Sequence, residues 1–309
     1  MAGERSTLTG TALAVTSVAS VQTGAALAAL LFPRVGPVGT VSLRLLGAAL
    51  VLTALTRPWR QRLTRADLGT SAVFGAVFVG MNVSLYVAID RLPLATGITL
   101  EFLGPLAVAV GTARSWRERI WALPAAVGVA LLGGSLHAGD LFGVGAALIA
   151  AGCWASYILL SRRLGRGPSG MAGLTLASAT GALVMLPIGA AAAGSALWRP
   201  DTLALGLLVG VVSSALPYSF DLLALRRLPT AVFGVLTSLN PAAAALAGLI
   251  VLGQAVPPRE LIGIAAVIVA GVGVTASARR SARRPAQGPS GEDVGVDVED
   301  ALASAGPGV

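Results

Sequence analysis

Apolar runs of about 20 residues recur along almost the whole chain, separated by short turns rich in Pro, Gly and Arg. A helix of about 20 residues is long enough to cross the roughly 30 Å hydrocarbon core of a bilayer. Helices also satisfy their own backbone hydrogen bonds, as the bilayer interior requires. The sequence therefore predicts an all-α polytopic membrane protein with ten transmembrane helices. The predicted spans are residues 8–32, 36–56, 67–90, 93–113, 120–136, 139–161, 171–193, 202–224, 229–252 and 258–277.

The composition supports this class and argues against several others. Of the 309 residues, 55% are hydrophobic and only 12% are charged, whereas soluble domains carry about a quarter charged residues. The net charge of +8 comes from Arg residues, most of them in short loops, so it does not indicate a nucleic-acid partner. The single Cys153 excludes an intrachain disulfide, and the single His137 excludes a multi-His metal site. Without a G-x-x-x-x-G-K, G-x-S-x-G or H-E-x-x-H motif, neither an enzyme nor a bound cofactor is predicted.

The distribution of arginine predicts the orientation, because positively charged loops favour the cytoplasmic side. With a cytoplasmic N-terminus, the inside segments hold 17 Arg residues and the outside loops hold four, while Arg44 is left inside a span. An even number of spans then places both termini in the cytoplasm. The four outside residues are Arg34, Arg91, Arg199 and Arg259.

A duplicated segment divides the chain into two halves. Residues 88–105, AIDRLPLATGITLEFLGP, match residues 224–241, ALRRLPTAVFGVLTSLNP, at an offset of 136 without a gap. Chance similarity between apolar sequences is the alternative, but the shared Arg-Leu-Pro and final Pro argue against it. Each half then has five spans, an odd number, so the second half enters the membrane from the side opposite to the first. The sequence predicts a 5+5 inverted-topology repeat, with repeats at 1–137 and 138–278.

The last segment, 279–309, differs from the spans. It begins with an Arg cluster, then becomes polar, acidic and rich in Gly and Pro, without apolar periodicity. Such a segment cannot bury a core, so a disordered cytoplasmic tail is predicted. Its Arg cluster would anchor the last helix against anionic lipid.

Three ionisable residues fall inside predicted spans, where charge is costly and therefore indicates function. Glu101 follows Pro93 by eight residues, which places it about 12 Å deep, close to the midplane. Its carboxylate could couple protons, bind a substrate ammonium or serve structure alone. Arg44 has a matching depth, so it could pair with Glu101, hold a substrate carboxylate or extend to the interface. Asp221 lies near the cytoplasmic end of its span, where solvation is easier.

Seven further residues could line a cavity between the halves, where transporters with inverted repeats bind their substrates. Each could instead serve interhelical hydrogen bonding or an aromatic belt. Pro105 and Pro241 each remove a backbone donor within a span, so both helices are expected to bend. The seven residues are Gln22, Asn82, Tyr86, Trp154, Tyr157, Tyr218 and Asn240.

These features resemble the drug/metabolite transporter superfamily with EamA-type repeats. The resemblance covers nearly the whole chain except the tail, and it is carried by short stretches in a consistent order. The stretches are residues 21–25, 31–33, 35–36, 43–45, 57–60, 100–102, 104–108, 215–219, 224–225 and 228–230.

The resemblance implies export of small neutral amino acids, such as threonine and homoserine, across the inner membrane, driven by the proton gradient. Two positions depart from it. Asn240 stands where an acid is implied before Pro241, and Gln254 stands where Glu is implied after Gly253. The buried acid near the midplane is then Glu101 alone.

We therefore expect an alternating-access exporter whose partners are a small-molecule substrate, the lipid bilayer and the proton gradient. Glu101 would bind the proton or the substrate ammonium, and Arg44 would pair with it or hold a substrate carboxylate. The alternatives are a drug or other metabolite transporter of the same fold, and a membrane sensor or scaffold without transport. A polar cavity would favour transport, whereas a fully packed interface between the halves would favour the scaffold.

Overall fold

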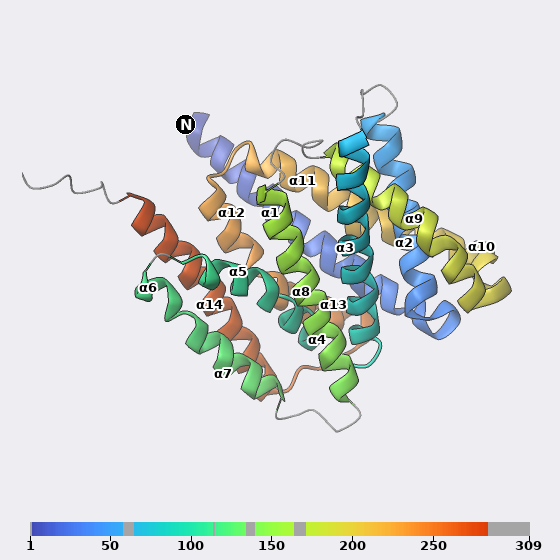
Figure 1. The fold of residues 1–309 in the computed structure, drawn as a ribbon. Helices are drawn as coiled ribbons and strands as arrows, with labels where there is room; N and C mark the ends of the chain where they lie inside the picture. The colour runs from blue at the N-terminus through green and yellow to red at the C-terminus, as the bar shows by residue number, and fades with distance from the viewer. Residues whose placement is uncertain (1, 58–64, 114, 134–139, 164–170, 284–309) are drawn as a thin grey trace, which may run out of the picture.

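The protein is a bundle of helices, seen as a ribbon in Figure 1. The structure is a computed structural model that describes residues 2–57, 65–113, 115–133, 140–163 and 171–283. Every regular element within these ranges is helical, which confirms the predicted all-α class. The predicted boundary between the repeats and most of the predicted tail lie outside the described residues. The last helix continues five residues past the predicted start of the tail, since no Pro interrupts it before Pro285.

The helices follow one another with short connections. The bounds in the first half are α1 (Ala2–Ala29), α2 (Phe32–Thr56), α3 (Arg65–Ile89), α4 (Leu94–Glu101), α5 (Leu103–Gly111), α6 (Trp116–Arg119) and α7 (Ala122–Gly133). Those in the second half are α8 (Leu141–Arg163), α9 (Met171–Ala193), η3 (Gly194–Trp198), α10 (Pro200–Gly210), η4 (Val211–Ala215), α11 (Leu216–Leu225), α12 (Thr230–Thr237), α13 (Asn240–Leu252) and α14 (Pro258–Arg283).

Nine helical segments within the described ranges are long and apolar enough to cross a membrane, which confirms a multi-pass membrane protein. They are Thr7–Ala29, Phe32–Thr56, Ala72–Ile89, Leu94–Gly111, Leu141–Leu160, Thr175–Trp198, Pro200–Leu225, Val232–Leu252 and Pro258–Ala278. The remaining predicted span, residues 120–136, corresponds to α7, whose described part has 12 residues.

The duplicated segment has the same local structure in both copies. α4 and α12 each have eight residues, and each bound of α12 lies 136 residues after the corresponding bound of α4. Both helices follow a Pro with nearly the same backbone angles, φ −53° and ψ 142° at Pro93 and φ −57° and ψ 139° at Pro229. Each is followed by a break and then by a second helix, α5 or α13, with a Pro in its first turn. The two broken helices run in opposite directions in Figure 1.

Each half packs its first helix against the other half. α1 lies against α11, α12 and α13, and α8 lies against α3, α4 and α5. The duplicated turns make equivalent contacts: a Cβ on Gly10 would lie 2.8 Å from Leu228, and one on Gly143 would lie 2.9 Å from Leu92. Leu92 and Leu228 are both buried. The repeated Arg-Leu-Pro thus places a leucine against a glycine of the partner half.

A close crossing of α7 and α14 joins the halves at one side of the bundle. A Cβ on Gly128 would lie 2.6 Å from the carbonyl oxygen of Gly263, and one on Gly263 would lie 2.9 Å from that of Gly128. Small residues let helix backbones approach in a membrane, where no hydrophobic effect drives helices together. The reciprocal contact makes this crossing a centre of the pseudo-symmetry.

We predict that Gly143→Val destabilises the protein, because its new side chain would overlap Leu92. Overpacking of this kind costs about 1–3 kcal/mol. Gly145→Val is the matched control, since a Cβ two residues further along α8 would meet nothing within 4 Å. Thermal unfolding of the detergent-solubilised variants should show a lower Tm for Gly143→Val than for Gly145→Val. Equal Tm values would contradict the assigned contact.

Candidate functional site

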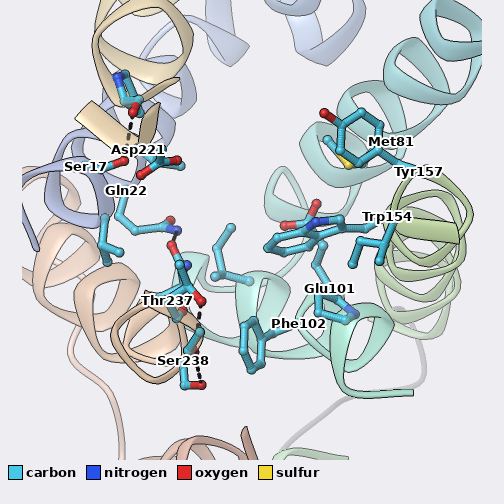
Figure 2. A pocket seen from close by; sticks show the side chains of 18 of the residues that line it. Ser17, Gln22, Met81, Glu101, Phe102, Trp154, Tyr157, Asp221, Thr237 and Ser238 are labelled. Atoms are coloured by element: carbon cyan, nitrogen blue, oxygen red, sulfur yellow. Dashed lines mark hydrogen bonds between the residues drawn. The ribbon is translucent and has the colours of Figure 1, made fainter. Parts of the chain in front are cut away.

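A cavity of about 630 Å³ lies between the halves of the bundle. Side chains from α1, α2, α3, α4, α5 and α8 line it together with side chains from η4, α11, α12, α13 and α14. Figure 2 shows Ser17, Gln22 and Asp221 on one wall and Met81, Trp154 and Tyr157 on the facing wall. The interface between the halves is therefore not fully packed.

The cavity extends toward one end of the bundle. We call this end the N-terminal face, because α1 begins there and α5, α8, α11 and α14 end there; the other end is the opposite face. The lining reaches Leu225, at the end of α11, and Thr275, which lies in the last third of α14. Toward the opposite face the lining stops at Ala25, before the end of α1, and at Ile98, short of the residue where α4 begins. The structure is thus hollowed toward the N-terminal face and closed beyond the centre.

Glu101 is the last residue of α4, at the break before α5. Pro105, four residues later, has no N–H to donate to the Glu101 carbonyl oxygen, so the α-helical ladder is interrupted here. A Cβ on Gly104 would overlap the carbonyl of Ala151, so a glycine lets α5 approach α8 closely. The Glu101 side chain is 5% exposed and faces the cavity. Its carboxylate makes no hydrogen bond or ion pair with any residue in the described part of the chain.

At the equivalent break in the second half, a polar side chain replaces the missing backbone donor. Pro241 leaves the carbonyl oxygen of Thr237 without its usual donor, and Asn240 donates its Nδ2–H to that oxygen at 2.8 Å. Asn240 Oδ1 accepts a hydrogen bond from Nε2 of Gln22 at 2.7 Å, which connects the break to α1. Oε1 of Gln22 is buried and has no hydrogen-bond partner. An ionised acid at 240 could not donate to Thr237, so the structure accounts for Asn at this position.

Arg44 brings a positive charge into the same cavity. Its side chain is 6% exposed, so it does not extend to the interface. Nη1 donates to the Tyr86 hydroxyl at 3.0 Å and Nη2 donates to the Ser213 carbonyl at 3.4 Å, while Nε has no partner. The guanidinium also lies 5.4 Å from the centre of the Tyr86 ring, a cation–π distance. A neutral hydroxyl and a carbonyl hold the cation in place without neutralising it.

A π-helical segment, η4, supplies acceptors to α1 and α2. π-helical turns are rare and occur often at functional sites. Besides the Ser213 carbonyl used by Arg44, the Val212 carbonyl accepts a hydrogen bond from Ser20 Oγ at 2.6 Å. The Pro217 carbonyl, just after η4, accepts one from Ser17 Oγ at 3.1 Å. Irregular backbone at membrane depth is thus satisfied by neighbouring side chains.

Aromatic rings and a second carboxylate complete the walls. Trp154 lies edge-on to Phe102 with ring centres 6.2 Å apart. Tyr218 and Asp221, one turn apart on α11, line the cavity nearer the N-terminal face. Tyr157 of α8 lies across the cavity from Asp221 in Figure 2. The cavity therefore combines two carboxylates and one guanidinium with apolar and aromatic surface.

The structure brings together nine of the ten predicted site residues as cavity lining. Tyr86 is the exception: it is fully buried behind Arg44, because its hydroxyl and ring hold the guanidinium. The possible ion pair between Arg44 and Glu101 is not formed, although both line the cavity. Sequence reasoning missed Thr237 as a lining residue. The repeat contained that signal, since Thr237 lies 136 residues after Glu101.

Comparisons with known proteins identify related chains. Residues 141–276 match the EamA-like transporter family. The threonine/homoserine exporter RhtA of Escherichia coli K12 is 41% identical over 267 residues, which cover 85% of this chain and 90% of the relative. The protein of the same name from Salmonella typhimurium LT2 has the same identity and coverage. A solved crystal structure covers 90% of this chain with a TM-score of 0.57 and 24% identity, and all of that chain is aligned; it shares the fold.

We predict that the cavity admits a membrane-impermeant maleimide from the N-terminal face only. In a Cys153→Ser background, Thr275→Cys places a thiol on the lining of the cavity. Ala270→Cys is the matched control on the same helix, because Ala270 is fully buried. Thr275→Cys should be labelled in vesicles that expose the N-terminal face and Ala270→Cys should not. Labelling of both positions, or of neither, would contradict the position of the cavity.

Proposed function

The chain belongs to the EamA-like transporter family, and from that premise we propose that it exports small neutral amino acids resembling threonine and homoserine. Family membership itself makes the chain a transporter and not an enzyme. The identity of 41% to the named exporters supports the substrate class. We further propose that it resides in the inner membrane, that both termini are cytoplasmic and that it uses the proton gradient. The inside excess of arginine supports that orientation.

The observation that carries the proposal is a carboxyl group and a guanidinium that line one cavity without a hydrogen bond or ion pair between them. A free amino acid is a zwitterion, so a site for it needs an acceptor for the ammonium and donors for the carboxylate. Glu101 presents a carboxylate without a hydrogen-bond or ion-pair partner among the described residues. Arg44 presents a guanidinium whose Nε is unpaired. Because the two are not bonded to each other, both remain available to opposite ends of one substrate.

The wall formed by the second break supplies groups for a hydroxyl side chain. The unpaired Oε1 of Gln22 can accept a hydrogen bond from an alcohol, while Nε2 of Gln22 is held by Asn240. Thr237 and Ser238 line the same wall beside them. Threonine and homoserine both carry one hydroxyl beyond the zwitterion. A polar site of this kind discriminates against analogues without the hydroxyl, because its buried acceptor would stay unpaired.

A drug or larger metabolite is the second candidate substrate. The cavity of about 630 Å³ and its aromatic rings, among them Phe102, Trp154 and Tyr157, would suit a larger apolar molecule. Part of that volume lies between Asp221 and the N-terminal face, along the proposed access path from the cytoplasm. The charged pair favours the amino acid, and a competition experiment separates the two. A hydrophobic amine that inhibits efflux more strongly than homoserine does would favour the alternative.

We predict that cells producing the protein export preloaded labelled threonine faster than control cells, and that Glu101→Gln abolishes the increase. The amide keeps the size of the side chain but cannot exchange a proton or balance an ammonium. Asp201→Asn is the matched control, because Asp201 is an exposed carboxylate paired with Arg34 and Arg199 outside the cavity. Efflux retained in Glu101→Gln would make this carboxylate structural. Equal efflux with and without the protein would overturn the substrate assignment.

We predict that Arg44→Gln raises the threonine concentration needed for half-maximal transport by about 10- to 100-fold. This range corresponds to the loss of a hydrogen bond to a charged group, about 1.5–3 kcal/mol. Uptake into reconstituted vesicles at varied threonine concentrations measures it. Tyr86→Phe, which removes only the hydroxyl behind Arg44, should give a smaller increase in the same direction. An unchanged concentration dependence in both variants would exclude Arg44 from binding.

A further inference from the structure

A hydrogen bond between the halves lies where the cavity closes. The backbone N–H of Leu94, the first residue of α4, donates to Oε1 of Gln254 at 2.9 Å. The first N–H groups of a helix lack an intrahelical acceptor, so a side chain that reaches one stabilises the helix end. Gly253, with a left-handed φ of 66°, ends α13 immediately before Gln254. The bond thus connects the start of α4 to the end of α13 at the opposite face.

A second hydrogen bond reinforces this closure. Oγ1 of Thr96 donates to Oε2 of Glu260 at 3.1 Å, and both side chains are buried. Glu260 belongs to the first turn of α14, where a carboxylate is favoured by the helix dipole. The positions equivalent to Thr96 and Glu260 in the other copy are Val232 and Pro124, which cannot form this bond. The opposite face therefore has one closing contact without a counterpart.

The contact of Gln254 does have a counterpart in the repeat. The residue 136 positions before Gln254 is Glu118, and the residue 136 positions after Leu94 is Thr230, the first residue of α12. Glu118 also carries a side-chain oxygen, and Thr230 also begins a helix after a Pro. In this structure Oε1 of Glu118 instead accepts a hydrogen bond from Ser115 Oγ at 2.9 Å. The lining of the cavity extends toward this end of the bundle.

Both partners belong to segments that flank one end of α14. α6, which carries Glu118, packs against α14, and so does α12. Trp121, just after α6, donates Nε1–H to Ser277 Oγ at 2.9 Å. A Cβ on Gly234 of α12 would lie 3.1 Å from Thr275, two residues earlier on the same helix. Glu118 and the start of α12 are thus placed around the same turns of α14, near the mouth of the cavity.

We propose that Gln254 and Glu118 are the paired gate residues of the transport cycle. When the N-terminal face closes, Glu118 moves from Ser115 to the N–H of Thr230, and Gln254 releases Leu94. The inference rests on the proposed alternating-access transport. It also explains Gln at 254, where the family resemblance implies Glu: the site needs an acceptor oxygen, which an amide provides as well as a carboxylate.

The test measures how often the cavity opens to the opposite face, and it uses no substrate. In a Cys153→Ser background, Ala25→Cys places a reporter thiol at the closed end of the cavity. A membrane-impermeant maleimide is added on the opposite face and the labelling rate is measured. Gln254→Leu removes the acceptor at the closed face, so labelling should be about fivefold faster, the shift expected from losing one hydrogen bond. Glu118→Leu should make labelling slower, by up to about fivefold, because the Ser115 hydroxyl lost as a partner in this structure is only partly buried and can turn to water, whereas the N–H of Thr230 would lose its acceptor in the closed face.

Two further variants separate the gate from a structural role of Glu118. Thr230→Pro removes the donor N–H, and Pro is well accepted at the first helical position, where ψ 139° at Pro229 suits a residue before Pro. Thr230→Ala, which also loses the Thr side chain but keeps the N–H, is its control and should leave the rate unchanged. Thr230→Pro should slow labelling as Glu118→Leu does. Glu118→Gln keeps an acceptor oxygen and should restore the parental rate.

The labelling rates of these variants support or overturn the gate assignment. Unchanged or faster labelling in Glu118→Leu and Thr230→Pro would overturn the assignment of Glu118, and slowing in Glu118→Leu alone would overturn Thr230 as its partner. If Glu118→Leu does not fold, Thr230→Pro and Glu118→Gln decide the result. Because labelling needs no substrate, the gate stands or fails separately from the assignment of threonine as cargo.

Discussion

A bilayer has no water to satisfy a backbone group that a proline leaves unpaired, and the centre of this protein depends on that constraint. Pro105 and Pro241 interrupt two helices at equivalent positions. Both breaks lie on the cavity wall, at Glu101 and at Thr237–Asn240. The broken helices bring backbone ends and polar side chains to membrane depth, where an unbroken apolar helix would present only side chains.

The two breaks are resolved differently, and the difference gives the cavity its polarity. At the second break Asn240 satisfies the freed carbonyl of Thr237 and is itself held by Gln22. At the first break the position equivalent to Asn240 is Gly104, which has no side chain, and the carboxyl group of Glu101 faces the cavity instead. The two halves therefore contribute different walls, one with the ionisable group of Glu101 and one with the hydrogen-bonded Asn240 and Gln22. Such asymmetry suits a substrate with a charged end and a polar side chain.

The gate inference and the site follow from the same pseudo-symmetry. The first helix of each half packs against the other half. The equivalent leucines, Leu92 and Leu228, pack on glycines of the other half. A symmetric scaffold has two equivalent closures, one at each face, and the structure shows the one at the opposite face. The additional bond of Thr96 to Glu260 is present only there. A cavity hollowed toward the N-terminal face is consistent with that imbalance.

By itself the sequence determined the class, the spans and the duplication, because membrane spans are read from length and apolarity and the repeat is read from an ungapped match. It also located Glu101 and Arg44, since charge at membrane depth is rare. Only the tertiary structure decided which partners each of them has. Arg44 turns to Tyr86 and Ser213 and not to Glu101, and Asn240 bridges Thr237 and Gln22. These pairings depend on which helices cross and how closely they approach. Contacts between residues up to 218 positions apart cannot be read from a local sequence pattern.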